Sequence, residues 1–186
     1  MNFNTHSRLE GQHAFLSPSN YHWVNYDDDK LDVRYHKAIM ARLGTQRHEF
    51  AHHAISMGVK LADTPTTLNM YVNDAIGFRM QSEQRLYYSE NCFGTADAIS
   101  FRDNLLRVHD LKNGDSPTSM KQLEVYAALF CLEYGYNPFY ISMETRIYQH
   151  DAIEIHIPDP DDIMHIMDKI ITFDKRIEQI KAEEAV

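Results

Sequence analysis

Asp97, Asp110 and Lys112 lie among the apolar residues of the stretch that runs from Gly94 to Lys112. The pattern predicts two strands joined by a turn at residues 102–104, where Asp and Asn are residue types that tolerate turn geometry. A charge inside a half-buried hairpin is costly unless it is paired or bound to a metal. Asp97, Asp110 and Lys112 are therefore expected to form a site. The apolar residues of the two strands are Phe93, Ala96, Ile99 and Phe101 in the first and Leu105, Leu106, Val108 and Leu111 in the second.

The chemistry that these three residues suit is metal-assisted hydrolysis of a phosphodiester. The turn would bring Asp97 beside Asp110, and Lys112 would share a face with Asp110, because strand side chains alternate with a period of two. Hard divalent cations such as Mg²⁺ prefer oxygen ligands, and a lysine can orient a water or offset developing charge. A surface ion pair would explain Asp-x-Lys equally well. The elements around the hairpin must distinguish a metal site from a surface ion pair.

The order of predicted elements favours a single α/β domain, residues 1–186, with a central mixed sheet flanked by helices. Residues 1–16 are polar and are expected to be a loosely held lead-in, after which Ser19 is predicted to cap a helix. The other predicted helices cover residues 31–57, 66–80, 120–134 and 160–182. Strands are expected at residues 83–90, in the hairpin, and at 139–148 and 153–157.

Composition excludes several classes of protein. The net charge of −9 argues against a protein that coats nucleic acid non-specifically, but not against an enzyme whose carboxylates hold cations. The two cysteines, Cys92 and Cys131, form no Cys-x-x-Cys pair, so a cysteine zinc site or iron–sulfur cluster is not expected. No apolar run is long enough to cross a bilayer, and no signal peptide is apparent. A cytoplasmic protein is expected.

Four motifs in order resemble those of the RecB-like branch of the PD-(D/E)XK nucleases, over roughly residues 17–157. They are Gly44-Thr45-Gln46-Arg47-His48, Gly94-Thr95-Ala96-Asp97-Ala98, His109-Asp110-Leu111-Lys112 and Gln122-Leu123-Glu124-Val125-Tyr126. The resemblance implies a restriction-endonuclease-like core and a DNA nuclease dependent on Mg²⁺ or Mn²⁺, with an exonuclease of phage type, active in DNA recombination, repair or degradation, as the expected form. For a phage-encoded chain the host cytoplasm would be its location.

The same resemblance implies a role for each matched residue. His48, Asp97 and Asp110 would ligate the metal, together with the backbone carbonyl of Leu111. Lys112 would be the catalytic lysine. The remaining two residues, Gln122 and Tyr126, would position the site or the DNA strand.

The start of the chain also resembles the CRISPR-associated and phage members of this branch, through Ser17-Pro18-Ser19 and Trp23. Many of those members carry a four-cysteine iron–sulfur cluster whose first cysteine follows such a tryptophan. Asn25-Tyr26 stands in that region here, and there is no later cysteine cluster. The chain is therefore expected to resemble the shorter members without a cluster. Toroidal assemblies occur among related phage exonucleases, so a homo-oligomer is possible, and DNA is the expected partner.

A competing motif lies on the same early helix. His48-Glu49-Phe50-Ala51-His52 matches H-E-x-x-H, the zinc peptidase signature, with both histidines on one helix face. Eleven histidines raise the chance of an accidental match, and Glu83, the available third ligand, is predicted to lie on a strand. The peptidase would also leave the hairpin charges unexplained. A nuclease-like fold used only to bind DNA is the other alternative, although Asp97, Asp110 and Lys112 are all retained.

Overall fold

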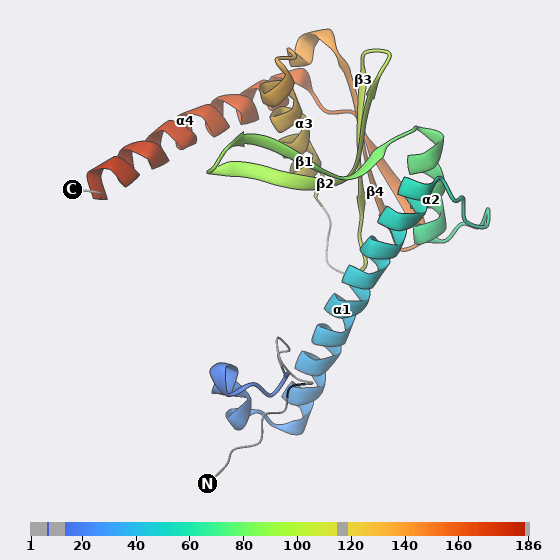
Figure 1. Ribbon diagram of the computed structural model, residues 1–186, viewed down its shortest axis with the longest axis vertical. Helices are drawn as coiled ribbons and strands as arrows, with labels where there is room; N and C mark the ends of the chain where they lie inside the picture. Colours follow the sequence, from blue (N-terminus) through green and yellow to red (C-terminus); the bar gives the residue numbers. More distant parts are fainter. Residues whose placement is uncertain (1–6, 8–13, 115–118, 185–186) are drawn as a thin grey trace. The chain divides into compact units, whose positions relative to one another are not determined.

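The computed structural model describes residues 7, 14–114 and 119–184. The described residues form two compact units, one ending at Thr45 and one beginning at Gln46, where the sequence predicts a single domain. The order of elements is η2, α1, α2, β1, β2, β3, α3, η3, β4, β5 and α4 (Figure 1). Most of the lead-in predicted at residues 1–16 lies outside the described residues. No helix in the described part is long and apolar enough to cross a membrane.

The first unit contains a short 3-10 helix, η2 (Pro18–Asn25), in place of the predicted α-helix start. The predicted N-cap, Ser19, is wrong: Ser17 occupies that position, with Pro18 as the first helical residue. Proline suits this place because its fixed φ is compatible with a helix and the first helical N–H needs no intrahelical partner. The Trp23 indole donates a hydrogen bond back to the Ser17 carbonyl at 3.0 Å, which closes the segment on itself.

The long helix α1 (Asp28–Met57) begins three residues earlier than the sequence predicts. The Asp27 carboxylate accepts a hydrogen bond from the Lys30 backbone N–H at 2.8 Å and so caps the first turn. The end of the helix is as predicted, with Gly58 at φ +67°, a left-handed conformation that glycine adopts without strain. The buried residues of α1 all lie in the second unit: Ala51, Ala54 and Ile55.

The second unit is built on a five-stranded sheet in the order β1-β2-β3-β4-β5. Its strands are β1 (Gln81–Ser89), β2 (Cys92–Arg102), β3 (Leu105–Leu111), β4 (Ser142–Gln149) and β5 (Ala152–His156). Only β3 and β4 pair in parallel, and α3 (Lys121–Tyr134) lies between them in the sequence. The predicted α/β class and mixed sheet are therefore confirmed, and the arrangement is compatible with a restriction-endonuclease-like core.

The β2–β3 turn forms where the sequence predicts it. Asp103 and Asn104 both have positive φ, 50° and 60°, and Arg102 pairs with Leu105 across the turn. Two consecutive left-handed residues are what a tight two-residue hairpin connection requires, and Asp and Asn tolerate that conformation. This turn sets the register of the two strands that carry Asp97 and Asp110.

Helices cover the sheet on both faces (Figure 1). One buried cluster joins the sheet to α3 and to the start of α4 (Pro160–Glu184), and it includes Leu106, Leu123 and Ile163. The other joins the sheet to α2 (Thr67–Gly77) and the end of α1, and it includes Val72 and Tyr148. A remaining short helix, η3 (Pro138–Tyr140), precedes β4.

The apolar residues of the last helix differ in burial along its length. Ile163 is fully buried, and Ile166, Met167 and Ile170 pack against the same cluster, so core packing accounts for the first half of α4. Phe173, Ile177 and Ile180 are exposed in the second half.

Candidate metal centre

The hairpin brings the two aspartates together. Ala98 pairs with His109, and continuing the same antiparallel register places Asp97 opposite Asp110. The Asp97 carboxylate accepts a hydrogen bond from the Leu111 backbone N–H at 2.9 Å, which fixes its direction toward the end of β3. The predicted role of the Leu111 carbonyl stays a prediction.

Lys112 joins Asp110 to the helix α3. Its ammonium donates to Asp110 Oδ1 at 3.1 Å and to Gln122 Oε1 at 3.0 Å. Asp110 is buried, and although its Oδ2 atom lies 3.0 Å from the Lys112 nitrogen, that oxygen accepts no hydrogen bond from any described residue. A buried carboxylate oxygen is costly unless a positive charge meets it, and the Lys112 ammonium supplies that charge here.

Tyr126, one turn after Gln122 on α3, holds the helix against β2. Its hydroxyl donates to the Thr95 carbonyl at 2.6 Å. A Cβ atom added to Gly94 would lie only 3.0 Å from the Tyr126 ring, so the absence of a side chain at Gly94 lets the ring pack closely on the strand. The contact ties α3 to the strand two residues before Asp97.

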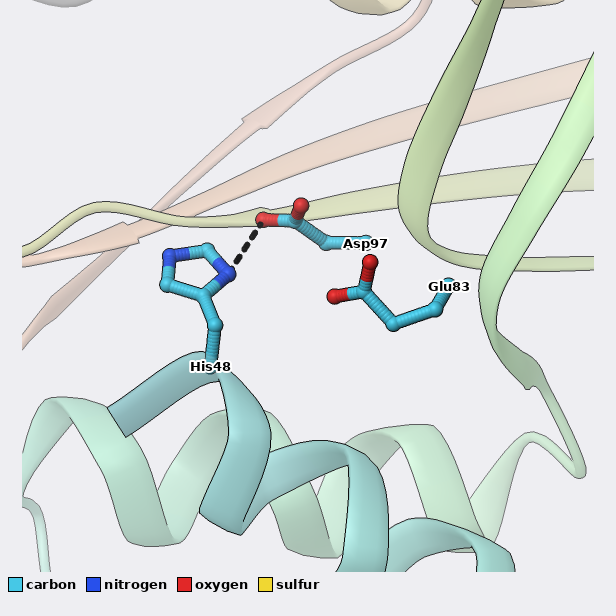
Figure 2. Close-up of side chains that lie close together, drawn as sticks. All are labelled: His48, Glu83 and Asp97. Carbon is cyan, nitrogen blue, oxygen red and sulfur yellow. Dashed lines mark ion pairs between the residues drawn. The ribbon is translucent and has the colours of Figure 1, made fainter. Parts of the chain in front are cut away.

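His48 reaches the same place from α1. Its Nδ1 atom lies 3.6 Å from Asp97 Oδ2, and both side chains are about a fifth to a third exposed. Figure 2 shows the His48 ring rising from the helix toward the Asp97 carboxylate, with the Glu83 carboxylate beside them. One ligand atom from each of the three residues lies within 4.8 Å of the others.

Glu83 is the member of this group that sequence reasoning did not assign to the nuclease site. It stands on β1 opposite Asp97, between the pairs Ser82–Ala98 and Gln84–Ala96. Its φ of +54° is unusual for a residue with a side chain, and such strained backbone clusters at functional sites. The signal in the sequence is an acidic residue on the strand that must pair with the Asp97 strand.

The other half of the H-E-x-x-H motif points elsewhere. His52 Nδ1 lies 2.8 Å from the Ser82 hydroxyl, and His52 is not part of the potential ligand group found among the described residues. Glu49 is exposed on α1. This geometry gives the peptidase alternative no support.

The electrostatics of the site favour a bound cation. Burial, and after it the neighbouring carboxylates of Asp110 and Glu83, raise the pKa of Asp97 to about 6, against the opposing influence of the Leu111 N–H and His48. Carboxylates gathered in a partly buried site repel one another until a positive charge joins them. Imidazole nitrogen with several carboxylate oxygens is a donor set that suits Mn²⁺, and the oxygens alone suit Mg²⁺. The residues present therefore fit the predicted metal.

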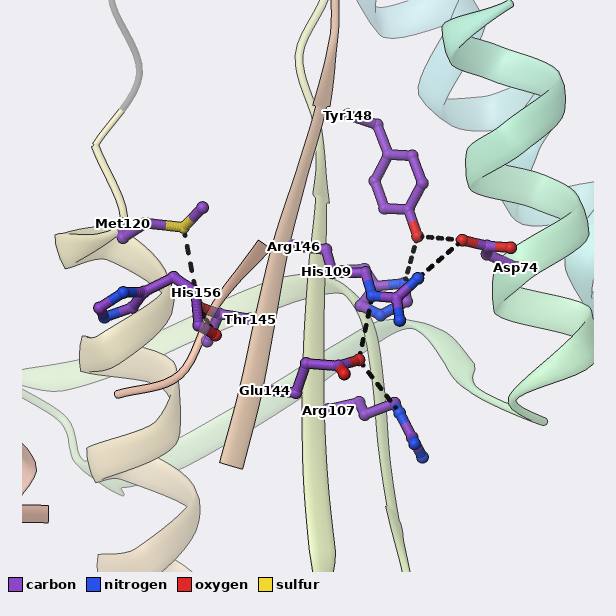
Figure 3. Close-up of polar contacts among 9 residues, drawn as sticks. All are labelled: Asp74, Arg107, His109, Met120, Glu144, Thr145, Arg146, Tyr148 and His156. Carbon is purple, nitrogen blue, oxygen red and sulfur yellow. Dashed lines mark hydrogen bonds and ion pairs between the residues drawn. The ribbon is translucent and has the colours of Figure 1, made fainter. Parts of the chain in front are cut away.

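His109, next to Asp110 on β3, belongs to a separate network (Figure 3). It is fully buried, and its Nδ1 atom lies 3.2 Å from the Tyr148 hydroxyl, which donates to Asp74 on α2 at 2.7 Å. Arg146 donates to the same Asp74 oxygen at 3.0 Å and to Glu144 at 3.0 Å. Burial lowers the pKa of His109 to about 3. These contacts tie α2 to the sheet and agree with a structural role for His109.

Comparison with known proteins adds no relative. No protein-family model, curated protein or solved structure matches the chain. The resemblance to RecB-like nucleases therefore rests on the four sequence motifs alone.

Proposed function

We propose that this protein is a DNA nuclease that depends on Mg²⁺ or Mn²⁺, of the RecB-like PD-(D/E)XK type and acting as an exonuclease. The observation that carries the proposal is the contact of Lys112 with the buried Asp110 beside Asp97 and His48. These residues come from three separate stretches of the sequence, and each belongs to one of the resembling motifs. A zinc peptidase would use none of the hairpin charges.

His48, Glu83, Asp97 and Asp110 would hold the cation. When bound, the cation would neutralise phosphate charge and make a coordinated water more acidic. The chain's own part is positioning: Lys112 has three N–H donors and uses two of them on Asp110 and Gln122. The third can hold the attacking water or a phosphate oxygen, while Gln122 fixes the direction of the ammonium.

The reaction that fits this arrangement is hydrolysis by water. A water oxygen would form a bond to phosphorus, the P–O bond to one sugar oxygen would break, and that oxygen would take up a proton as it leaves. Electrostatic groups fixed near the developing charge contribute most when they need no rearrangement during the reaction. The Lys112 ammonium, which donates hydrogen bonds to residues of two elements, is such a group.

The proposal is tested with end-labelled linear DNA and covalently closed circular DNA, each with Mg²⁺, Mn²⁺ or a chelator. We expect cation-dependent loss of linear DNA only. Asp110→Asn and Lys112→Met should each lower the rate by about a hundredfold or more, as the loss of one fixed electrostatic group commonly does. Asp168→Asn and Lys169→Met, exposed residues on α4, are the matched controls and should cleave like the parent.

Each alternative has its own result in this assay. Equal cleavage by Asp110→Asn and the parent would show that the site assignment is wrong. Binding of DNA without cleavage by any variant would favour a DNA-binding module. Zinc in the purified protein, with peptide cleavage abolished by Glu49→Gln, would favour the peptidase. Cutting of the circular DNA would make the enzyme an endonuclease.

A further inference from the structure

A second feature of the described surface is a cavity of about 220 Å³ that shares Lys112 with the candidate metal centre. Arg47, the neighbour of His48 on α1, forms another part of its wall. At about 30 Å³ for each water, the cavity has room for roughly seven waters, or for a phosphate with part of its sugar. The complete lining is Arg47, Thr67, Lys112, Asn113, Gly114, Gln149, His150 and Asp151.

The charges of this cavity suit an anion. Arg47 and Lys112 bring two positive charges. The acidic side chain of the lining, Asp151, caps the start of α2. It accepts hydrogen bonds from the Thr67 backbone N–H at 2.7 Å and from the Thr67 hydroxyl at 3.1 Å. These bonds hold the pKa of Asp151 below its usual range. In a chain of net charge −9, Arg47 and Lys112 place two cations beside a carboxylate site, although Asp110 and Asp151 offset part of their charge.

Arg47 is the residue best placed to make a specific contact there. It is exposed, and its guanidinium donates one long hydrogen bond, 3.4 Å, to the Asn113 side chain. A guanidinium carries five N–H donors in a fork that matches two phosphate oxygens at once. The contact with Asn113 directs that fork to the cavity wall without using most of its donors.

We propose that this cavity binds the phosphate that neighbours the scissile one along the DNA strand, with Arg47 as its main contact. The inference rests on the proposed nuclease function. Lys112 faces both the metal centre and the cavity, so a strand whose scissile phosphate lies at the metal would carry its next phosphate toward Arg47. Arg47 is then a residue that binds the substrate, and its positive charge sets which phosphate of the strand occupies the cavity.

The first test compares Arg47→Gln with Arg176→Gln, an exposed arginine on α4 that serves as a charge-matched control. We expect Arg47→Gln to raise KM for DNA about tenfold with little change in kcat, because a contact made equally in the ground and transition states affects KM alone. The KM of Arg47→Lys should lie between those of Arg47→Gln and Arg176→Gln, since lysine keeps the charge but lacks the forked guanidinium. Thermal unfolding midpoints of the three variants verify that all are folded.

The second test locates the phosphate. A neutral methylphosphonate replaces the phosphate on either side of the scissile position, one at a time. At one of the two positions it should raise KM of the parent about tenfold but leave KM of Arg47→Gln unchanged, because the two changes remove the same contact. In chelator no cleavage occurs, so binding of a short single strand can be measured alone. The logarithm of the binding constant is plotted against the logarithm of the salt concentration, and the magnitude of the slope should be smaller by about 1 in Arg47→Gln.

The outcomes separate the two proposals. A parent that cleaves no DNA with either cation overturns the nuclease function and this inference with it. A parent that cleaves, with Arg47→Gln matching Arg176→Gln in KM and remaining sensitive to methylphosphonate at both positions, overturns only the inference. An unchanged salt slope in Arg47→Gln would also contradict it.

Discussion

At the scale of single residues, Asp97 carries the clearest electrostatic signature in the site. Folding raises its pKa from an ordinary 3.8 to about 6, mainly through burial. The metal-free folded chain therefore binds this proton more tightly than the unfolded chain does. The contribution of this proton to the stability of the folded chain is complete below about pH 4 and is lost as the pH rises through about 6.

This gives a prediction on pH and stability. In chelator at pH 7.5, Asp97→Asn should raise the free energy of unfolding by up to about 3 kcal/mol, because the asparagine carries no buried charge and can still accept from the Leu111 N–H. At pH 4 the variant and the parent should be equal. Urea unfolding at both pH values measures this, and a variant less stable than the parent at pH 7.5 would contradict it. Added Mn²⁺ should narrow this difference at pH 7.5, because it binds the parent more tightly than the variant and so stabilises the parent more.

Glu83 leads to a second prediction at the same scale. Glu83→Gln and His48→Ala should each weaken Mn²⁺ binding by about tenfold or more, because each removes one member of the ligand group. Glu49→Gln, on the exposed face of α1, is the control and should bind like the parent. Titration calorimetry measures the Mn²⁺ affinity of the three variants. Normal affinity in Glu83→Gln would mean that the metal lies toward Asp110 and away from β1.

At the scale of elements, α3 connects Lys112 to the strand that carries Asp97. Gln122 meets Lys112, and four residues later Tyr126 meets Thr95, so one helix face determines the spacing between β2 and the end of β3. The close approach depends on Gly94. The helix itself ends at Gly135, whose φ is +73°, as the sequence predicts.

The packing of Tyr126 on Gly94 can be tested directly. Gly94→Ala should lower the free energy of unfolding by about 1 kcal/mol, because the new methyl group presses on the Tyr126 ring. The same substitution in a Tyr126→Ala background should have almost no cost, since the ring is gone. Urea unfolding of the four proteins in this cycle measures the coupling. Equal costs in the two backgrounds would show that the ring is not the obstacle.

At the scale of the whole molecule, the proposed chemistry is confined to one of the two compact units. Every candidate site residue, from His48 to Tyr126, lies after Gln46. A chain that begins at Asp27 keeps the cap of α1 and should therefore show the same thermal shift with Mn²⁺ and the same cleavage rate as the full chain. Normal metal binding with lost cleavage would place DNA contacts in the residues removed.

The sequence by itself determined the features that depend on neighbours along the chain. The Asp-Asn turn fixes the hairpin, and its register, with the alternation of strand side chains, is enough to bring Asp97 to Asp110 and Lys112. The glycines at the ends of α1 and α3 could also be predicted, because a helix that ends in a left-handed residue imposes a local requirement on the residue type. The cap at Ser17 was missed, since Ser17 and Ser19 offer the same side chain and only the backbone distinguishes them.

Only the tertiary structure decided which distant elements meet at the site. Glu83 joins it through the pairing of β1 with β2 and a left-handed residue inside a strand, which no local pattern demands. His52, equivalent to His48 by helix spacing, turns instead to Ser82. Arg47 and Lys112 share a cavity because α1 and the end of β3 converge. Such contacts depend on long-range packing, which couples residues that sequence spacing leaves independent.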